Sequence, residues 1–207
     1  MRNRIWAIAA VLVLCVLTLT GCSSSGDEKE AASSSLYVTM INTHVPMEAA
    51  ETLQTTLEQA LPGLITPESG LTVNSISSGD TEKDPMGAMA GMTQIAAMMA
   101  SGEMELVLMD STNARRHGDN ASIYVPLSEL FTAEEQEQLG IVPVTLPVMD
   151  DDGVQTGEYT APCGVDLSAC TKITQLMYTN DVAAYVLIDS PHTEQAKEVI
   201  RWLLTAE

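Results

Sequence analysis

Two hydrophobic periodicities alternate along the chain after residue 35, and this alternation restricts the fold more than any other feature. Apolar, β-branched runs typical of buried strands occupy residues 36–43, 71–77 and 105–110. Residues 46–61 carry apolar side chains at helical spacing, and residues 85–100 lead to a Ser-Gly helix stop. Strand, helix, strand, helix and strand in this order build a parallel sheet with right-handed crossovers. The pattern therefore predicts an α/β fold.

The second half of the chain adds elements that need not be parallel. Thr132 and Glu135 match a capping box, which predicts the start of a helix. Residues 141–149 and 154–160 flank an Asp-rich turn and predict a hairpin. Residues 183–189 predict a last strand, and the helix after it has one apolar stripe: Ala196, Val199, Ile200, Leu203 and Leu204. We expect three layers, with helices on both faces of a mixed, mostly parallel sheet of five strands.

The strongly acidic composition excludes several kinds of partner. The 207 residues include 9 Lys and Arg against 28 Asp and Glu, a formal charge of −19. Such a surface repels nucleic-acid phosphates and anionic solutes, and no basic cluster reverses the sign locally. With two Trp, five Tyr and one Phe, the chain has few rings on which a sugar could stack. We therefore expect no nucleic-acid partner.

Residues 1–21 have the order of an export signal. Arg2 and Arg4 precede an apolar run over residues 5–17, which is shorter than the about 20 residues that a helix needs to cross a bilayer. Residues 19–22 (Leu-Thr-Gly-Cys) resemble the lipobox of bacterial lipoproteins. The resemblance implies cleavage before Cys22, diacylation of its sulfur and attachment to the lipid bilayer at the outer face of the cytoplasmic membrane. An ordinary secretory signal or an uncleaved anchor would leave the domain on the same side.

The chain between this signal and the first strand predicts a flexible tether. Residues 22–35 are rich in Ser, Glu and Ala and contain no large apolar side chain. Such a segment cannot bury enough surface to offset the entropy of ordering it. We therefore expect residues 36–207 to form the single folded domain.

Four short segments carry a family resemblance. They are residues 36–43 with the helix after them, residues 100–110, residues 125–131 (Val-Pro-Leu-Ser-Glu-Leu-Phe) and residues 183–204. They resemble the extracellular solute-binding proteins of ABC importers. In that family the second segment turns into the third strand, the third commonly follows it, and the fourth returns the chain into the first lobe. The resemblance implies a fold like one lobe of a type 2 periplasmic binding protein.

The resemblance covers one lobe. A second lobe would have to lie between Gly140 and Thr179, and this segment is too short to form one. A two-lobed protein encloses its ligand by closing, whereas one lobe offers an open platform. We expect a non-catalytic binding or accessory module that works beside a membrane permease or sensor protein. A purely protein-interacting domain without a small-molecule ligand, and a soft-metal binder, are the alternatives.

If the domain binds a small molecule, the site is expected at the carboxyl ends of the strands. Ligands of open α/β sheets gather at that edge, near the point where the strand order reverses. The alternative is that these polar residues only form turns and helix caps. The candidate residues are Thr43, His44, Ser78, Asp80, Asp110 and Ser111.

Two cysteines remain if Cys15 is cleaved away with the signal and Cys22 is acylated. They are Cys163 and Cys170, and outside the cytoplasm such a pair favours a disulfide. It would brace the loop between them. A redox-active pair is disfavoured, since the spacing is not Cys-x-x-Cys.

Met86, Met89 and Met92 recur at steps of three in a segment that is also rich in Ala and Gly. Soft thioethers in an exported protein can bind Cu(I). The preferred interpretation is core packing, because methionine commonly fills gaps in apolar interiors and this spacing keeps the side chains on one broad face.

No motif predicts catalysis or a cofactor. His44, His117 and His192 are scattered without zinc spacing, so we expect surface or capping roles for them. Nucleophile-elbow, phosphate-loop and dinucleotide motifs do not occur, and the Asp-rich turn lacks calcium-loop spacing. We expect a protein that is not an enzyme and holds no cofactor.

Overall fold

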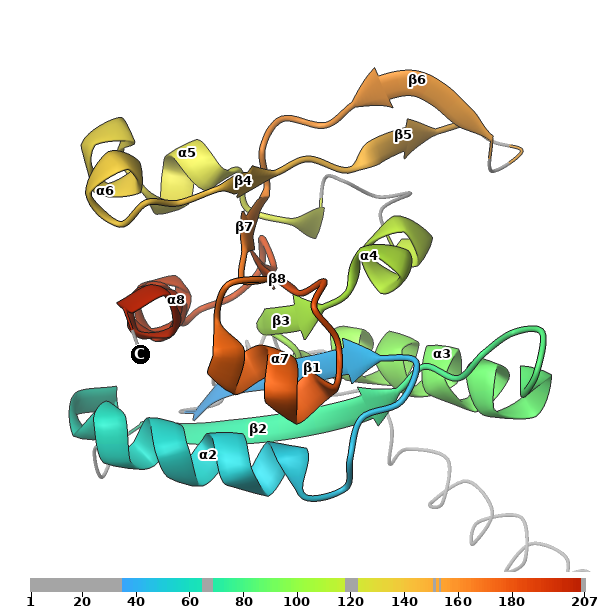
Figure 1. The fold of residues 1–207 in the computed structure, drawn as a ribbon, viewed down its shortest axis with the longest axis horizontal. Coiled ribbons are helices and arrows are strands. Elements are labelled where there is room, and N and C mark those ends of the chain that lie inside the picture. Colours follow the sequence, from blue (N-terminus) through green and yellow to red (C-terminus); the bar gives the residue numbers. More distant parts are fainter. Residues whose placement is uncertain (1–34, 65–68, 118–122, 151, 153, 206–207) are drawn as a thin grey trace, which may run out of the picture. The chain divides into compact units, whose positions relative to one another are not determined.

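The computed structural model describes residues 35–64, 69–117, 123–150, 152 and 154–205 (Figure 1). These residues belong to one of the chain's two compact units, Ser33–Glu207. The predicted signal, the predicted acylation site Cys22 and residues 23–34 of the predicted tether lie outside the described residues, whereas Ser35, expected to end the tether, begins the first strand. None of the described helices has the length and apolarity that crossing a membrane requires.

A mixed sheet forms the centre of the fold. Its strand order is β2-β1-β3-β8-β7-β4. β1 runs parallel to β2 and to β3, and the remaining neighbours, β3 with β8, β8 with β7 and β7 with β4, are antiparallel. The bounds are β1 (Ser35–Asn42), β2 (Gly70–Ser77), β3 (Leu106–Met109), β4 (Pro143–Val144), β7 (Gly164–Asp166) and β8 (Ala183–Val186).

The predicted α/β class is confirmed, but the sheet has six strands instead of five and is parallel only at one end. β7 was not predicted, and β4 takes only two residues of the run over residues 141–149 that was expected to be a hairpin strand; both are too short to show a two-residue period in the sequence. The predicted hairpin is present as a separate two-stranded sheet of β5 (Pro147–Met149) and β6 (Gln155–Tyr159).

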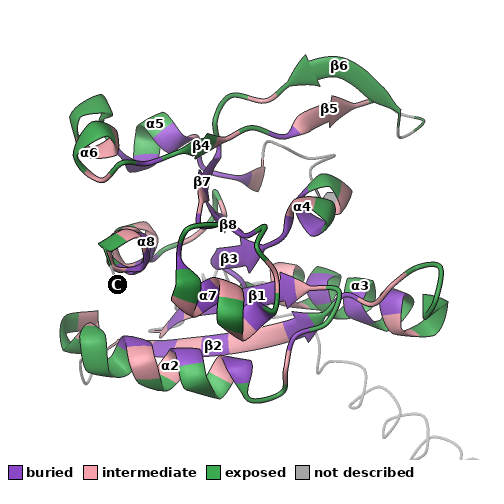
Figure 2. Ribbon diagram, in the orientation of Figure 1, coloured by how far each residue is buried: buried purple, intermediate pink, exposed green. Residues whose placement is uncertain are grey.

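Alternating side chains of the strands divide the core between the two faces of the sheet. In β3, Leu106 and Leu108 pack into one cluster, and Val107 and Met109 pack into the other. Figure 2 shows β3 and β8 buried throughout. The first cluster is covered by α2 (Ala49–Ala60), α5 (Leu127–Leu130), α7 (Thr171–Met177) and α8 (Thr193–Thr205), and the second by α3 (Pro85–Ser101) and α4 (Ser111–His117).

The helix ends follow local chemistry that the sequence displays. At α6 (Ala133–Gln138), the Thr132 hydroxyl accepts from the Glu135 N–H at 3.2 Å, and the Glu135 carboxylate accepts from the Thr132 N–H at 2.8 Å. The predicted capping box is therefore confirmed. A single 3-10 turn, η1 (Pro62–Leu64), follows α2. The stripe of α8 is confirmed too, with Leu204 only half-buried.

The methionines of α3 contradict the core-packing interpretation. Met86, Met89 and Met92 are 75%, 65% and 49% exposed. The helix instead buries Ala88, Gly91 and Ile95. The reason is close contact with the end of β2, since a Cβ on Gly91 would lie 2.7 Å from the Ser77 carbonyl oxygen. Only small side chains fit there, so the methionines face the solvent.

Candidate functional site

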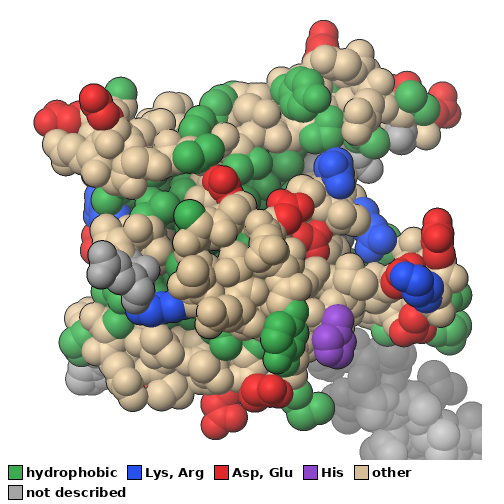
Figure 3. Space-filling model, in the orientation of Figure 1, with side chains coloured by type: hydrophobic (Ala, Val, Ile, Leu, Met, Phe, Trp, Pro, Cys, Tyr) green, Lys and Arg blue, Asp and Glu red, His purple; other side chains and the backbone are tan. Residues whose placement is uncertain are grey.

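A cleft of about 330 Å³ opens at the carboxyl end of β3, where the sheet changes from parallel to antiparallel pairing. This volume lies at the lower end of the range typical of small-ligand sites. Figure 3 shows acidic side chains in the middle of the face where β7, β8 and α4 lie. The lining residues are Ser111, Val142, Pro143, Val144, Thr145, Asp166, Ser168, Asp181, Val182, Ala183 and Tyr185.

Two aspartates and two serines supply the polar side of the cleft. The Ser111 hydroxyl and N–H both donate to Oδ2 of Asp181, at 2.5 and 3.2 Å. The Ser168 hydroxyl and N–H both donate to Oδ1 of Asp166, at 2.5 and 2.9 Å. Among the described residues, no donor reaches the second oxygen of either carboxylate. Each aspartate is therefore held in place by a serine and keeps one oxygen to which none of these residues donates.

Tyr185 closes the apolar side of the cleft. Its ring lies 5.0 Å from that of Tyr124, and burial raises the pKa of both phenols, so both hydroxyls stay protonated. β7 passes directly over this ring at Gly164, where a Cβ would come 2.6 Å from a ring carbon. Glycine therefore allows β7 to approach β8 closely enough to bring Asp166 to the cleft.

Of the predicted strand-edge residues, the cleft includes Ser111. Asp110, its neighbour, is buried and caps α4, since its carboxylate accepts from the N–H and the Nδ2 of Asn113 at 2.8 and 2.9 Å. This cap explains why α4 begins directly after Asp110. Thr43 and His44 are exposed in the turn after β1.

Ser78 and Asp80 shape the turn that follows β2. Ser78 is buried, and its hydroxyl has no hydrogen-bond partner among the described residues. Asp80 accepts from the backbone N–H groups of Glu82 and Lys83 and pairs with the Lys83 ammonium at 3.0 Å. The hydrogen bond from Lys83 is the main cause that lowers the pKa of Asp80. Neither residue lines the cleft.

Sequence reasoning missed five polar lining residues: Thr145, Asp166, Ser168, Asp181 and Tyr185. The only available signal was that Asp181 precedes a predicted strand at 183–189. Nothing in the sequence indicates that the strand containing Asp166 pairs with that strand, because β7 is three residues long.

Cys163 and Cys170 are free, buried thiols, so the structure does not show the expected disulfide. β7 separates them, and they belong to the core clusters on opposite faces of the sheet. Burial raises the pKa of the Cys163 thiol, which disfavours the reactive thiolate.

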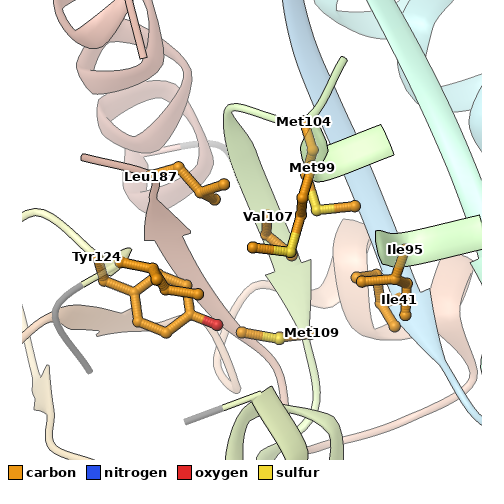
Figure 4. Close-up of a pocket in the computed structure, with 9 residues that line it drawn as sticks. Ile41, Ile95, Met99, Met104, Val107, Met109, Tyr124 and Leu187 are labelled. Carbon is orange, nitrogen blue, oxygen red and sulfur yellow. The ribbon is translucent and has the colours of Figure 1, made fainter. Parts of the chain in front are cut away.

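A second, smaller pocket lies on the sheet face that α3 covers. Figure 4 shows Met99, Met104 and Val107 on one side of it, with Tyr124 and Leu187 across from them. Its volume is about 10 Å³, close to the size of one water molecule, and every side chain around it is apolar apart from the Tyr124 hydroxyl. It is a gap in core packing and not a ligand site.

His192 is buried, contrary to the expected surface or capping role. Its Nδ1 lies 2.9 Å from Oε2 of Glu105, to which the Ser190 hydroxyl also donates at 3.1 Å. Burial raises the pKa of Glu105, and the hydrogen bonds from His192 and Ser190 oppose that shift. The carboxylate, not the imidazole, lies between the other two groups, so this is not the geometry of a Ser-His-acid triad. The group instead ties β3 to the segment before α8.

Within the described residues, no group of His, Cys, Asp and Glu side chains could hold a metal ion. The cleft combines two oriented carboxylates, hydroxyls and an apolar wall, an arrangement suited to a small molecule with hydrogen-bond donors.

The chain matches no protein-family model, no curated protein and no solved structure, so its functional assignment rests on this geometry.

Proposed function

We propose that this chain is a non-catalytic binding module, lipid-anchored through Cys22 outside the cytoplasmic membrane, that holds a small ligand in the cleft between Ser111, Asp166 and Asp181. The observation that carries the proposal is the cleft itself. Its volume is about 330 Å³, and it lies at the sheet edge where α/β proteins place their ligands.

The strand order supports a relationship to one lobe of a solute-binding protein. The segment that resembles the family's return into the first lobe supplies β8, which enters the sheet beside β3 and runs antiparallel to it. The region where a second lobe would stand contains β4, the hairpin, β7 and α7 instead. A module of this kind has an open cleft and would act together with a membrane permease or sensor.

The charges favour a ligand that carries ammonium groups. Asp166 and Asp181 each keep one carboxylate oxygen to which none of the described residues donates, and the chain as a whole has a charge of −19. An anionic solute would be repelled by both. An amine satisfies the free oxygens, and the apolar wall formed by Val182 and Tyr185 suits the methylene groups that join two amines.

The lining residues support a binding role over a catalytic one. The cleft has no imidazole and no thiol among its described lining residues. The Ser111 hydroxyl donates a hydrogen bond to the Asp181 carboxylate, which also accepts from the Ser111 N–H, as in a structural turn. Nothing in this arrangement activates a nucleophile at neutral pH.

A thermal-shift panel tests the proposal. Putrescine, spermidine, lysine, neutral amino acids and oligopeptides are added to the folded domain. A ligand at 100 times its Kd stabilises the native state by about 2.7 kcal/mol, which raises Tm by about 5–10 °C at this size. We expect a shift with an amine, lost in Asp181→Asn and kept in Asp189→Asn, an exposed aspartate outside the cleft. If no compound raises Tm, the amine-binding proposal fails and the alternative of a purely protein-interacting domain is favoured.

A further inference from the structure

We propose a second site, independent of the cleft, in which the exposed thioethers of Met86, Met89 and Met92 bind a soft monovalent metal ion, Cu(I) or its chemical analogue Ag(I). These three side chains are among the most exposed large apolar groups of the described residues. Met86 and Met89 lie on the solvent side of α3, and Met92, which is less exposed, borders the face by which that helix packs on β2.

The helix brings the methionines close enough to share an ion. Residues three apart on a helix are neighbours, with Cβ atoms about 5–6 Å apart. Met89 is therefore adjacent to both Met86 and Met92, and a methionine side chain is long and flexible enough for neighbouring sulfurs to converge. The first turn is held in place, because the Asp84 carboxylate caps it by accepting from the Gly87 N–H at 2.9 Å.

The composition of this helix selects for a soft ion. Residues 85–102 contain no Asp, Glu, His or Cys, so this helix offers a metal ion no carboxylate, imidazole or thiolate. The Thr93 hydroxyl is already bonded to the carbonyl of Met89 at 2.9 Å. Thioether sulfur is the ligand that remains, and it prefers Cu(I) over Mg²⁺, Ca²⁺ or Zn²⁺.

The surrounding charge favours a cation, and the ligands do not titrate. Asp80, Glu82 and Asp84 precede the helix, with Lys83 between them paired to Asp80, and Glu103 follows it, so acidic residues outnumber basic ones at both ends. A thioether carries no proton, so metal binding releases none. Affinity should therefore be the same at pH 5 and pH 8, unlike that of a site made of Cys, His or carboxylate ligands.

An Ag(I) titration followed by NMR of methionine methyl groups tests this site in chloride-free buffer. Ag(I) is redox-inert, and each methyl signal reports one residue. We expect the methyl signals of Met86, Met89 and Met92 to shift, equally at pH 5 and pH 8. The signal of buried Met40 should stay in place.

Two substitutions locate the site. Met89→Leu removes the sulfur common to both neighbouring pairs and should abolish the shifts of Met86 and Met92. Met47→Leu is the matched control, because Met47 is 93% exposed and stands outside the row. Both changes are at the surface and conserve volume, so Tm should not change. The proposal is overturned if Ag(I) leaves the three methyl signals in place, or if Met89→Leu binds as the wild type does. The first result would favour a protein-docking face.

Discussion

Gly91→Ala tests the close contact that turns the methionines of α3 to the solvent. Replacing glycine by alanine inside a helix ordinarily stabilises a protein by about 0.5–1 kcal/mol. Here the new Cβ would stand 2.7 Å from the Ser77 carbonyl oxygen and 2.9 Å from the Ser78 Cα, whereas real Cβ contacts are essentially never under 3.0 Å. Both obstructing atoms are backbone, so no side-chain rotation relieves the clash.

The expected result is a net loss of stability. Forcing a methyl group into a packed contact costs about 1–3 kcal/mol, which outweighs the gain in helix propensity. Urea unfolding followed by circular dichroism gives the free-energy change. Ala97→Gly, at an exposed position of the same helix, measures the propensity term alone and should cost about 1 kcal/mol. A Gly91→Ala protein more stable than the wild type would refute the close packing of α3 on β2.

Three further predictions concern other parts of the fold. Cys163 and Cys170 should both be alkylated when the protein is unfolded without reductant, as peptide mass mapping would show; an unmodified disulfide-linked peptide would contradict the free thiols. Asp110→Ala removes the cap of α4 and should lower the free energy of unfolding, measured in urea, by about 1 kcal/mol. An unchanged free energy of unfolding would contradict the capping role of Asp110. Hydrogen bonds from the Thr132 N–H and from Arg201 hold the pKa of Glu135 in the folded protein below its usual value. The Glu135 carboxylate therefore stabilises the fold at neutral pH, and this stabilisation is lost as the pH falls through the lowered pKa. Glu135→Gln should therefore flatten the acid side of a stability-against-pH curve, and an unchanged curve would contradict this.

The longer elements could be predicted because their pattern of apolar side chains repeats over many residues. The run over residues 36–43 became β1, and the stripe in residues 193–205 became the buried face of α8. The capping box at Thr132 was predictable for a different reason, since its chemistry is complete within four residues.

The cleft could not be predicted in full, because its residues meet only through tertiary pairing. Asp166 lies in the same cleft as Asp181 because β7 pairs with β8. β7 is too short to show a strand pattern in the sequence. Ser111 was found because it directly follows a strong strand. The methionines of α3 were misassigned because apolar character alone does not say which face of a helix is covered, and here the small side chains at Ala88 and Gly91 decided it.

The most direct test of the binding role is amide NMR of the folded domain titrated with putrescine and spermidine. The account predicts that the largest shifts fall on Ser111, Ser168 and Asp181, whose N–H groups lie at the cleft, and that Asp181→Asn removes them. If neither amine moves these signals, or if the largest shifts fall on another face and persist in Asp181→Asn, the cleft is not an amine-binding site.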